Sequence, residues 1–181
     1  RWDKAEYMAE LGKPRLGVLI SGGNLDSMLC RYTAAKNERS VDKYTAGGAV
    51  GQRPDHATAV YAQLVKQLWP DMPVIIGGIE ASLRRLAHYD YWDNSIHPSI
   101  LVDSGADWLC YGMGERTMLE LTRAIESGRN LRQMENIAQL AFYRKGTCKL
   151  DGALVLHSYE RCLEEPRSFA ENFHQIEIHA N

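Results

Sequence analysis

Cysteine is scarce in this chain, with four among 181 residues. None stands in a CxxC or CxxxCxxC arrangement, the spacing by which short loops hold zinc or an iron–sulfur cluster. None of the six histidines has another four residues along the chain, and HExxH is absent. We therefore expect reduced, mostly buried thiols and no metal bound within this segment. The cysteines are Cys30, Cys110, Cys148 and Cys162.

Long apolar runs are also missing. No stretch approaches the ~20 residues of a membrane-spanning helix, and no signal peptide opens the chain, so we expect a cytoplasmic location. The formal net charge is only −2, with both signs mixed, which does not indicate nucleic-acid binding. The GxSxG elbow of many serine hydrolases does not occur.

What the chain does contain is a recurring unit of strand, glycine turn and helix. Apolar runs typical of buried parallel strands occupy residues 16–20, 73–76 and 108–111. This repetition predicts an α/β fold with a doubly wound, mainly parallel sheet, Rossmann-like or flavodoxin-like. Such sheets bind ligands beyond the carboxyl ends of their strands, which is where all three glycine turns fall.

The last part of the chain has a different pattern. Apolar runs at residues 140–144 and 153–156 flank two glycine turns, which predicts a hairpin, and a charged helical segment follows from Ser158. Residues 37–53 are polar and without period, as in functional or mobile loops. We divide the chain into a Rossmann-like domain at 1–150 and a connecting strand and helix at 151–181.

The first turn combines small and polar residues directly after a strand. Small residues let the backbone approach a ligand, and a helix start offers free amides to an anion. The simpler interpretation is a tight turn with Asn24 or Asp26 as helix cap. The candidate anion-binding residues are Ser21, Gly22, Gly23, Asn24 and Asp26.

This turn also resembles the SGGxDS loop of ATP pyrophosphatases, with one residue inserted before Asp26. The insertion rotates the carboxylate by about 100° around the helix. A nucleotide-binding ATP pyrophosphatase is therefore an alternative interpretation.

The second turn opens an unusually dense run of special residues. Paired arginines suit a carboxylate or phosphate, and the aromatic residues suit a stacking wall. The simpler account is that Glu80 acts as a cap and pairs with Arg84 one helical turn later. We favour substrate binding or an interface for Glu80, Ser82, Arg84, Arg85, His88, Tyr89 and Asp90. Gly77 and Gly78 are candidates for binding an anion through the loop, as are Gly112, Gly114 and Glu115 of the third turn.

The third turn, residues 111–117, places Glu115 at a predicted helix start, where its charge favours the helix dipole. Gly112 and Gly114 let the loop line a pocket shared with the other two turns. No catalytic residue is assigned from any of the three turns.

Five segments of the sequence carry a family resemblance. They are SGGNLDSM (21–28), QRPDHAT (52–58), GGIEASLRRLAHYDYWD (77–93), SILVDS (99–104) and YGMGE (111–115). Together they resemble the YgiQ-like family of radical S-adenosylmethionine (SAM) proteins over about Trp2 to Glu126. The stretch from Leu156 to Glu160 is similar to the one that this family places before its catalytic domain.

The resemblance implies an N-terminal accessory domain similar to cobalamin-binding Rossmann-like domains. It also implies that the family's first strand and helix are missing, in keeping with a chain that starts at Arg1. A radical SAM barrel, with a CxxxCxxC-bound [4Fe-4S] cluster and S-adenosylmethionine, is implied downstream. Cobalamin is not expected, because DxHxxG is absent.

On this interpretation the longer protein is an enzyme, and this segment alone is inactive. Its glycine turns cap the barrel mouth, and its partners are the downstream radical SAM domain and a small-molecule or macromolecular substrate. A non-catalytic docking module is the other alternative.

Overall fold

The computed structural model describes residues 2–180 except 130–133, 135–136 and 147–151. The chain divides into two compact units. The first comprises Arg1–Arg85 and Ile100–Tyr143, and the second comprises Leu86–Ser99 and Arg144–Asn181. Each is described by itself.

The first unit contains a four-stranded sheet in the order β1-β2-β5-β6. Strands β1 (Val18–Ser21), β2 (Val74–Gly77) and β5 (Trp108–Cys110) run parallel. Strand β6 (Leu140–Phe142) is antiparallel to β5. The predicted mainly parallel α/β sheet is thereby confirmed.

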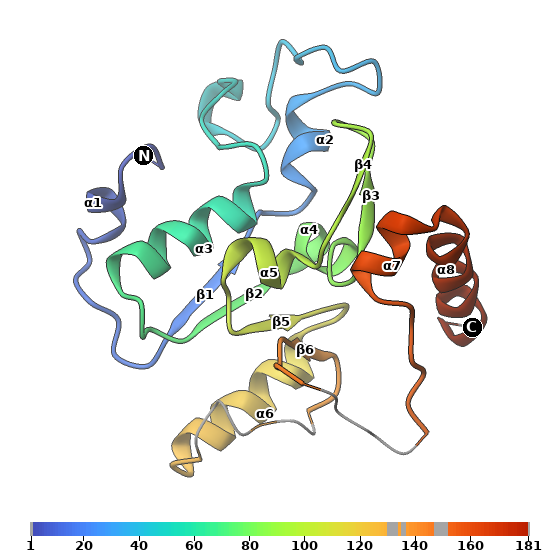
Figure 1. The fold of residues 1–181 in the computed structure, drawn as a ribbon. Coiled ribbons are helices and arrows are strands. Elements are labelled where there is room, and N and C mark those ends of the chain that lie inside the picture. The colour runs from blue at the N-terminus through green and yellow to red at the C-terminus, as the bar shows by residue number, and fades with distance from the viewer. Residues whose placement is uncertain (1, 130–133, 135–136, 147–151, 181) are drawn as a thin grey trace. The chain divides into compact units, whose positions relative to one another are not determined.

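Helices lie on both faces of this sheet (Figure 1). On one face, α3 (Ala57–Leu68), α4 (Gly78–Leu83) and α5 (Ile100–Ser104) enclose a core centred on fully buried Ile76 and Leu109. On the other face, α6 (Glu115–Glu126) packs Leu121 and Ala124 against Trp108. The buried strands are apolar on both sides because both sides are covered, as is typical of parallel sheets.

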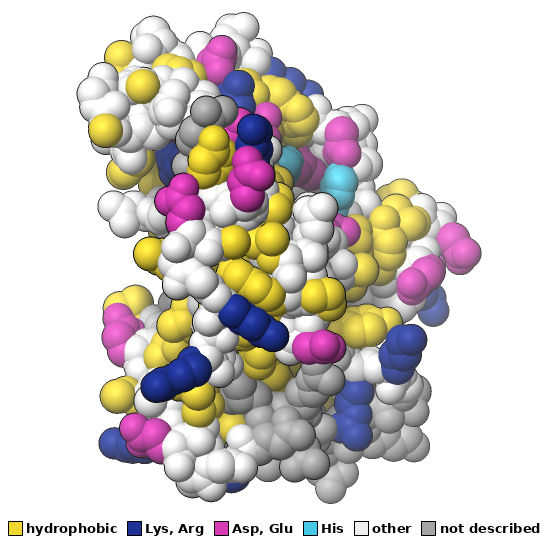
Figure 2. Space-filling model, turned by 90° about the vertical axis from the view of Figure 1, so that its left-hand side faces the viewer, with side chains coloured by type: hydrophobic (Ala, Val, Ile, Leu, Met, Phe, Trp, Pro, Cys, Tyr) yellow, Lys and Arg dark blue, Asp and Glu magenta, His cyan; other side chains and the backbone are white. Residues whose placement is uncertain are grey.

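Strand β1 is less covered than its neighbours. Among the described residues it pairs only with β2, and Leu19, on the α6 side of the sheet, remains 63% exposed. On the side of the molecule shown in Figure 2, exposed hydrophobic side chains lie among interspersed charges of both signs.

The polypeptide between β1 and α3 is mostly irregular. It holds the short helix α2 (Ser27–Arg31) and the 3-10 turn η1 (Ala46–Gly48). Helix α3 starts only after His56, which has a left-handed backbone (φ 50°). Near the N-terminus, α1 spans only Ala5–Met8.

The second unit contains the antiparallel pair β3 (His88–Asp90) and β4 (Ser95–His97), with helices α7 (Tyr159–Glu164) and α8 (Pro166–Ala180). The Tyr159 hydroxyl donates to the Ile96 carbonyl at 3.2 Å, which ties α7 to β4.

The hairpin of the molecule is therefore not the predicted one. Strand β6 pairs with β5, and residues 153–156 carry no strand. The sequence predicted that residues 140–144 pair with residues 153–156. Instead, β6 pairs with a strand 30 residues upstream, with Leu140 opposite Cys110. None of the described helices is long and apolar enough to cross a membrane.

Candidate functional site

The three glycine turns lie together at the carboxyl ends of β1, β2 and β5. A Cβ atom on Gly78 would lie only 2.6 Å from the Ser21 Oγ, so the first and second turns are in contact. The Ser82 hydroxyl donates to the Gly78 carbonyl at 2.7 Å and accepts from the Gly112 N–H at 3.3 Å. One serine thus links the second turn to the third.

A cavity of about 360 Å³ opens at this edge of the sheet. Its lining is mostly apolar, with Leu19, Ile75 and Met118 beside the backbone of Gly78 and Gly114. The volume falls within the roughly 300–1,000 Å³ of small-molecule pockets. No charged side chain is among the described residues that line it, so it suits an apolar group better than an anion.

Glu80 is not at this cavity but beneath the first turn. Its side chain is almost fully buried, and its carboxylate accepts from the Ser27 N–H at 2.8 Å and the Thr58 N–H at 2.9 Å. These amides belong to the first turns of α2 and α3, which otherwise lack partners. A Cβ on Gly22 would lie 2.9 Å from the Glu80 Oε2, so only glycine leaves room for the carboxylate.

This arrangement bears on anion binding by the first turn. A carboxylate from within the protein already occupies amides that an external phosphate would need. Glu80 is therefore a cap, as the simpler interpretation held, but it caps two other helices rather than its own.

Asp26 and Arg84 form a second internal pair. One Asp26 oxygen accepts from the N–H groups of Met28 and Leu29, which makes Asp26 the N-cap of α2. Its other oxygen binds the Arg84 Nη1, with side chains 3% and 15% exposed. The i+4 pair of Arg84 with the Glu80 carboxylate is thus replaced by a pair with Asp26, although Nη1 also reaches the Glu80 carbonyl at 3.4 Å.

Sequence reasoning missed two residues of this region, Asp42 and Arg53. The Arg53 Nη2 binds both carboxylate oxygens of Asp42, at 3.1 and 2.9 Å, and its Nη1 donates to the Gly22 carbonyl at 3.2 Å. Arg53 thereby fastens the long loop to the first glycine turn. No local pattern signals this contact, because 31 residues separate Arg53 from Gly22.

The remaining candidates of the first unit lie toward the surface. Arg85 donates to the Ser82 carbonyl at 2.8 Å, and its guanidinium lies 5.1 Å from the Tyr111 ring centroid. Asn24 is exposed, and Glu115 is exposed at the first position of α6.

His88, Tyr89 and Asp90 belong to the second unit, in β3. The Asp90 carboxylate accepts from the Trp92 N–H at 2.8 Å, and the Tyr89 hydroxyl donates to the Asn94 side chain at 2.7 Å. The His88 ring stacks on that of His97, with centroids 5.9 Å apart. These contacts shape the hairpin and its turn.

Next to them, His97 lies 2.7 Å from the Asp93 carboxylate. Hydrogen bonds from Ser95 and then from His97 hold the pKa of Asp93 below its ordinary value. Neither Asp93 nor His97 was among the candidates named from the sequence.

The described residues offer no group of three or more His, Cys, Asp or Glu side chains that could hold a metal ion. Cys30, Cys110 and Cys162 are all buried, and they lie on α2, β5 and α7. Cys148 lies outside the described residues. These described residues do not fit an iron–sulfur cluster, so no chemistry is assigned to one within this chain.

The comparison with protein families decides the relationship. The model of the family described as "Radical SAM N-terminal" matches residues 1–181. The chain belongs to this family. The resemblance drawn from the five sequence segments is confirmed.

Relatives of this radical SAM N-terminal domain carry the name UPF0313 protein. One from Clostridium botulinum (strain ATCC 19397 / Type A) is 43% identical over 172 residues, which cover 95% of this chain and 27% of the relative. One from Thermotoga petrophila is 41% identical over 170 residues, which cover 94% of this chain and 30% of the relative. The chain therefore spans less than a third of their length. No solved structure matches it significantly.

Replacing the buried carboxylate tests its role in this radical SAM N-terminal domain. In Glu80→Gln, an NH2 group that cannot accept a hydrogen bond replaces one carboxylate oxygen. At least one of the two buried backbone N–H donors therefore loses its acceptor. We expect the free energy of unfolding to fall by about 1–3 kcal/mol, as measured by urea denaturation. Glu10→Gln, at an exposed position, is the control. Equal stability of the two variants would contradict the role given to Glu80.

The Asp42–Arg53 contact predicts a dependence of stability on pH. Burial raises the pKa of Asp42, but the hydrogen bonds from Arg53 and the Tyr44 N–H outweigh burial and leave the pKa below its ordinary value. The folded form therefore gains stability from the charged carboxylate above the unfolded pKa of about 3.9, and loses it as the pH falls through the folded pKa.

In Asp42→Asn this contribution is absent. We expect the difference in unfolding free energy between the parent protein and the variant to be large at pH 7 and to shrink toward pH 3, in denaturation series at both values. Asp71→Asn, at an exposed position, is the control and should show little difference at either pH. A difference for Asp42→Asn that does not change with pH would refute the assignment.

Proposed function

We propose that this domain acts, within a longer protein, as a lid on a radical SAM catalytic domain. The observation that carries the proposal is the meeting of three glycine turns around one apolar cavity at the carboxyl ends of parallel strands. Ligands of doubly wound sheets bind at this edge. Lid and catalytic domain together form an enzyme whose substrate reaches the cavity rim.

The chemistry of the family supports a lid that excludes water. When bound in the catalytic domain, a [4Fe-4S] cluster would pass one electron from an external reductant to S-adenosylmethionine, and the resulting carbon radical would take a hydrogen atom from the substrate. Closing an active site keeps water from such a reactive species. The cavity is apolar, and Met113, between Gly112 and Gly114, is 75% exposed. Both features suit a surface that loses its water when the lid closes on the catalytic domain.

The length of the relatives supports the same proposal. About 70% of each relative lies outside the region matched by this chain, which is ample for a catalytic domain. In the proposed layout, α7 and α8 form part of the connection toward that domain.

The internal contacts refine which residues serve the lid. Glu80 accepts hydrogen bonds from the starts of α2 and α3, and Asp26 binds Arg84. These contacts hold the turns in place. Ser82 and Arg85 support the rim. The substrate itself contacts the backbone of the second and third glycine turns and the side chain of Met118, whereas Leu19 is left to a separate element. The hairpin residues His88, Tyr89 and Asp90 lie on the second unit and are not assigned to the lid.

A charge at the rim tests the lid. We expect Met113→Glu, in the full-length protein loaded with its cluster, to form 5′-deoxyadenosine from S-adenosylmethionine about tenfold more slowly, because the carboxylate resists desolvation on closure. The measurement is chromatography of 5′-deoxyadenosine under reducing conditions. Iron content and thermal stability should stay at the parental level.

Leu119→Glu is the matched control, since Leu119 is 58% exposed on α6 and lies outside the third glycine turn. Unchanged turnover in Met113→Glu would overturn the lid. A loss of turnover accompanied by an equal loss of stability would assign Met113 a structural role instead.

We also propose that the free side of β1 takes up a further strand and helix of the longer protein. The exposed Leu19 and the unpaired edge of β1, among the described residues, support this, since parallel sheets are covered on both faces. The neighbouring helix α6 covers β2 and β5 on the same face, and the added helix lies beside it.

Leu19 gives this proposal a sharp test. In the full-length protein we expect Leu19→Ser to lower the unfolding free energy by about 1.5–3 kcal/mol, since a buried leucine is lost. In the 181-residue chain the same substitution should cost less than about 0.5 kcal/mol. Leu11→Ser, at a fully exposed position, is the control in both proteins. Equal costs of Leu19→Ser in the long and short proteins would exclude a covering element.

A further inference from the structure

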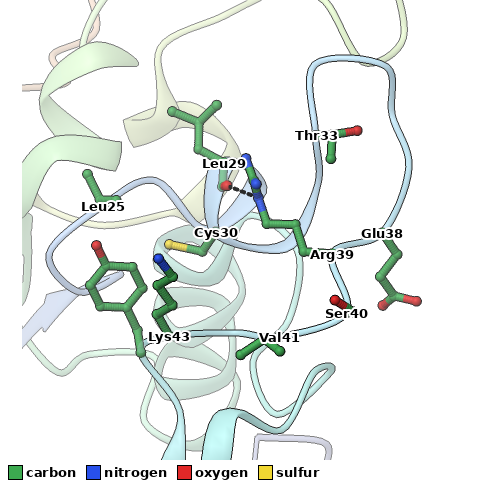
Figure 3. Close-up of a pocket in the computed structure, with 10 residues that line it drawn as sticks. Leu25, Leu29, Cys30, Thr33, Glu38, Arg39, Ser40, Val41 and Lys43 are labelled. Carbon is green, nitrogen blue, oxygen red and sulfur yellow. Dashed lines mark hydrogen bonds between the residues drawn. The ribbon is translucent and has the colours of Figure 1, made fainter.

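A second cavity lies beside the first glycine turn, between α2 and the irregular segment that follows it (Figure 3). Its volume is about 600 Å³, and none of its lining residues lines the strand-end cavity. It belongs entirely to the first unit. The lid does not use it.

One wall of this cavity is apolar. Leu25 and Leu29 come from the start and middle of the α2 region, and Val41 faces them from the loop. Their side chains are 38%, 52% and 52% exposed, so no other part of the described protein covers them fully. Apolar side chains around a hollow provide a binding surface for the flat face of a ligand.

The other wall is positively charged. Of the nearby carboxylates, Asp42 binds Arg53 at 2.9 Å, and Glu38, which lines the cavity, binds Arg31 at 3.0 Å; Arg31 is shared with Asp55, at 3.1 Å. The Arg39 Nε donates to the carbonyls of Leu29 and Tyr32, both at 3.1 Å. Because these acceptors are neutral, they do not balance the positive charge of Arg39.

Lys43 adds a second charge. It forms no ion pair with any residue in the described part of the chain, and its side chain extends into the cavity in Figure 3. With Arg39 it gives the cavity two cationic groups beside an apolar wall. Such a combination favours a ligand that is both flat and anionic.

Tyr44 completes the lining. Its N–H donates to the Asp42 carboxylate at 2.9 Å, and its ring lies 6.0 Å from the Arg53 guanidinium, so the residue is anchored. The side chain is still 48% exposed. An anchored, half-exposed tyrosine is a stacking platform for an aromatic base.

We propose that this cavity binds a nucleoside monophosphate, with the base between Tyr44 and the leucines and the phosphate at Lys43. The base requires an apolar and aromatic wall, the phosphate requires uncompensated cations, and the volume suits a molecule of this size. The site differs from the ATP site considered for the first glycine turn, since Glu80 occupies amides there.

The test uses the full-length protein with its cluster and with saturating S-adenosylmethionine, so that the catalytic site is filled. Isothermal titration with adenosine 5′-monophosphate should show one saturable site. Adenosine should bind about tenfold more weakly because it lacks the phosphate, and inorganic phosphate should show no saturable binding.

Variants identify the site. Lys43→Gln should weaken binding of adenosine 5′-monophosphate about tenfold and leave adenosine unchanged, whereas Tyr44→Leu should weaken both about tenfold. Lys36→Gln is the matched control, as it removes the same charge from the same segment but does not line the cavity. All variants are compared at equal thermal stability.

Three results would each overturn the proposal. The first is no saturable binding of adenosine 5′-monophosphate. The second is equal weakening by Lys43→Gln and Lys36→Gln, which would show only general charge attraction. The third is equal affinity for the nucleotide and adenosine, which would show an apolar cavity without phosphate recognition. None of these results bears on the lid, because Met113 and the glycine turns are left intact.

Discussion

The buried carboxylate of Glu80 is the constraint on which the structure at the carboxyl ends of the parallel strands depends. It receives one backbone N–H from α2 and one from α3, and so joins two helix starts that are far apart in the chain. Gly22 has to be glycine because the carboxylate lies where its side chain would be. Since Glu80 itself sits in the first turn of α4, three helices and the first glycine turn are fixed by one side chain.

Around this carboxylate the polar residues divide into two roles. Asp26, Arg84, Asp42 and Arg53 form ion pairs directed inward, and they hold the loops in place. The surface that remains for a ligand at the strand ends is made of backbone and apolar side chains. A domain that grips a substrate by charge would show the reverse, with its carboxylates and arginines pointing into the cavity. The inward pairs are consistent with the proposed lid, which would act by its shape and by excluding water.

The sequence predicted the features that depend on local pattern. Strands β1, β2 and β5, their glycine turns and α6 follow from apolar runs and from residues that favour turns, and Asp26 was one of two residues proposed as the helix cap. The partner of Arg84 could not be predicted, because Asp26 is 58 residues away and the i+4 alternative was equally sound chemistry. The same holds for Glu80, for Arg53 and for β6, whose partners are set by the packed fold. The family was recognised from motifs even though the roles of several motif residues differ from those first assigned.

The direction of β6 has a consequence for how the polypeptide continues. Leu140 lies opposite Cys110 and Phe142 opposite Trp108, so the chain enters this strand at the cavity edge and leaves the sheet at the far edge. Any later part of the chain that contacts the cavity therefore has to run back along the whole length of the strands.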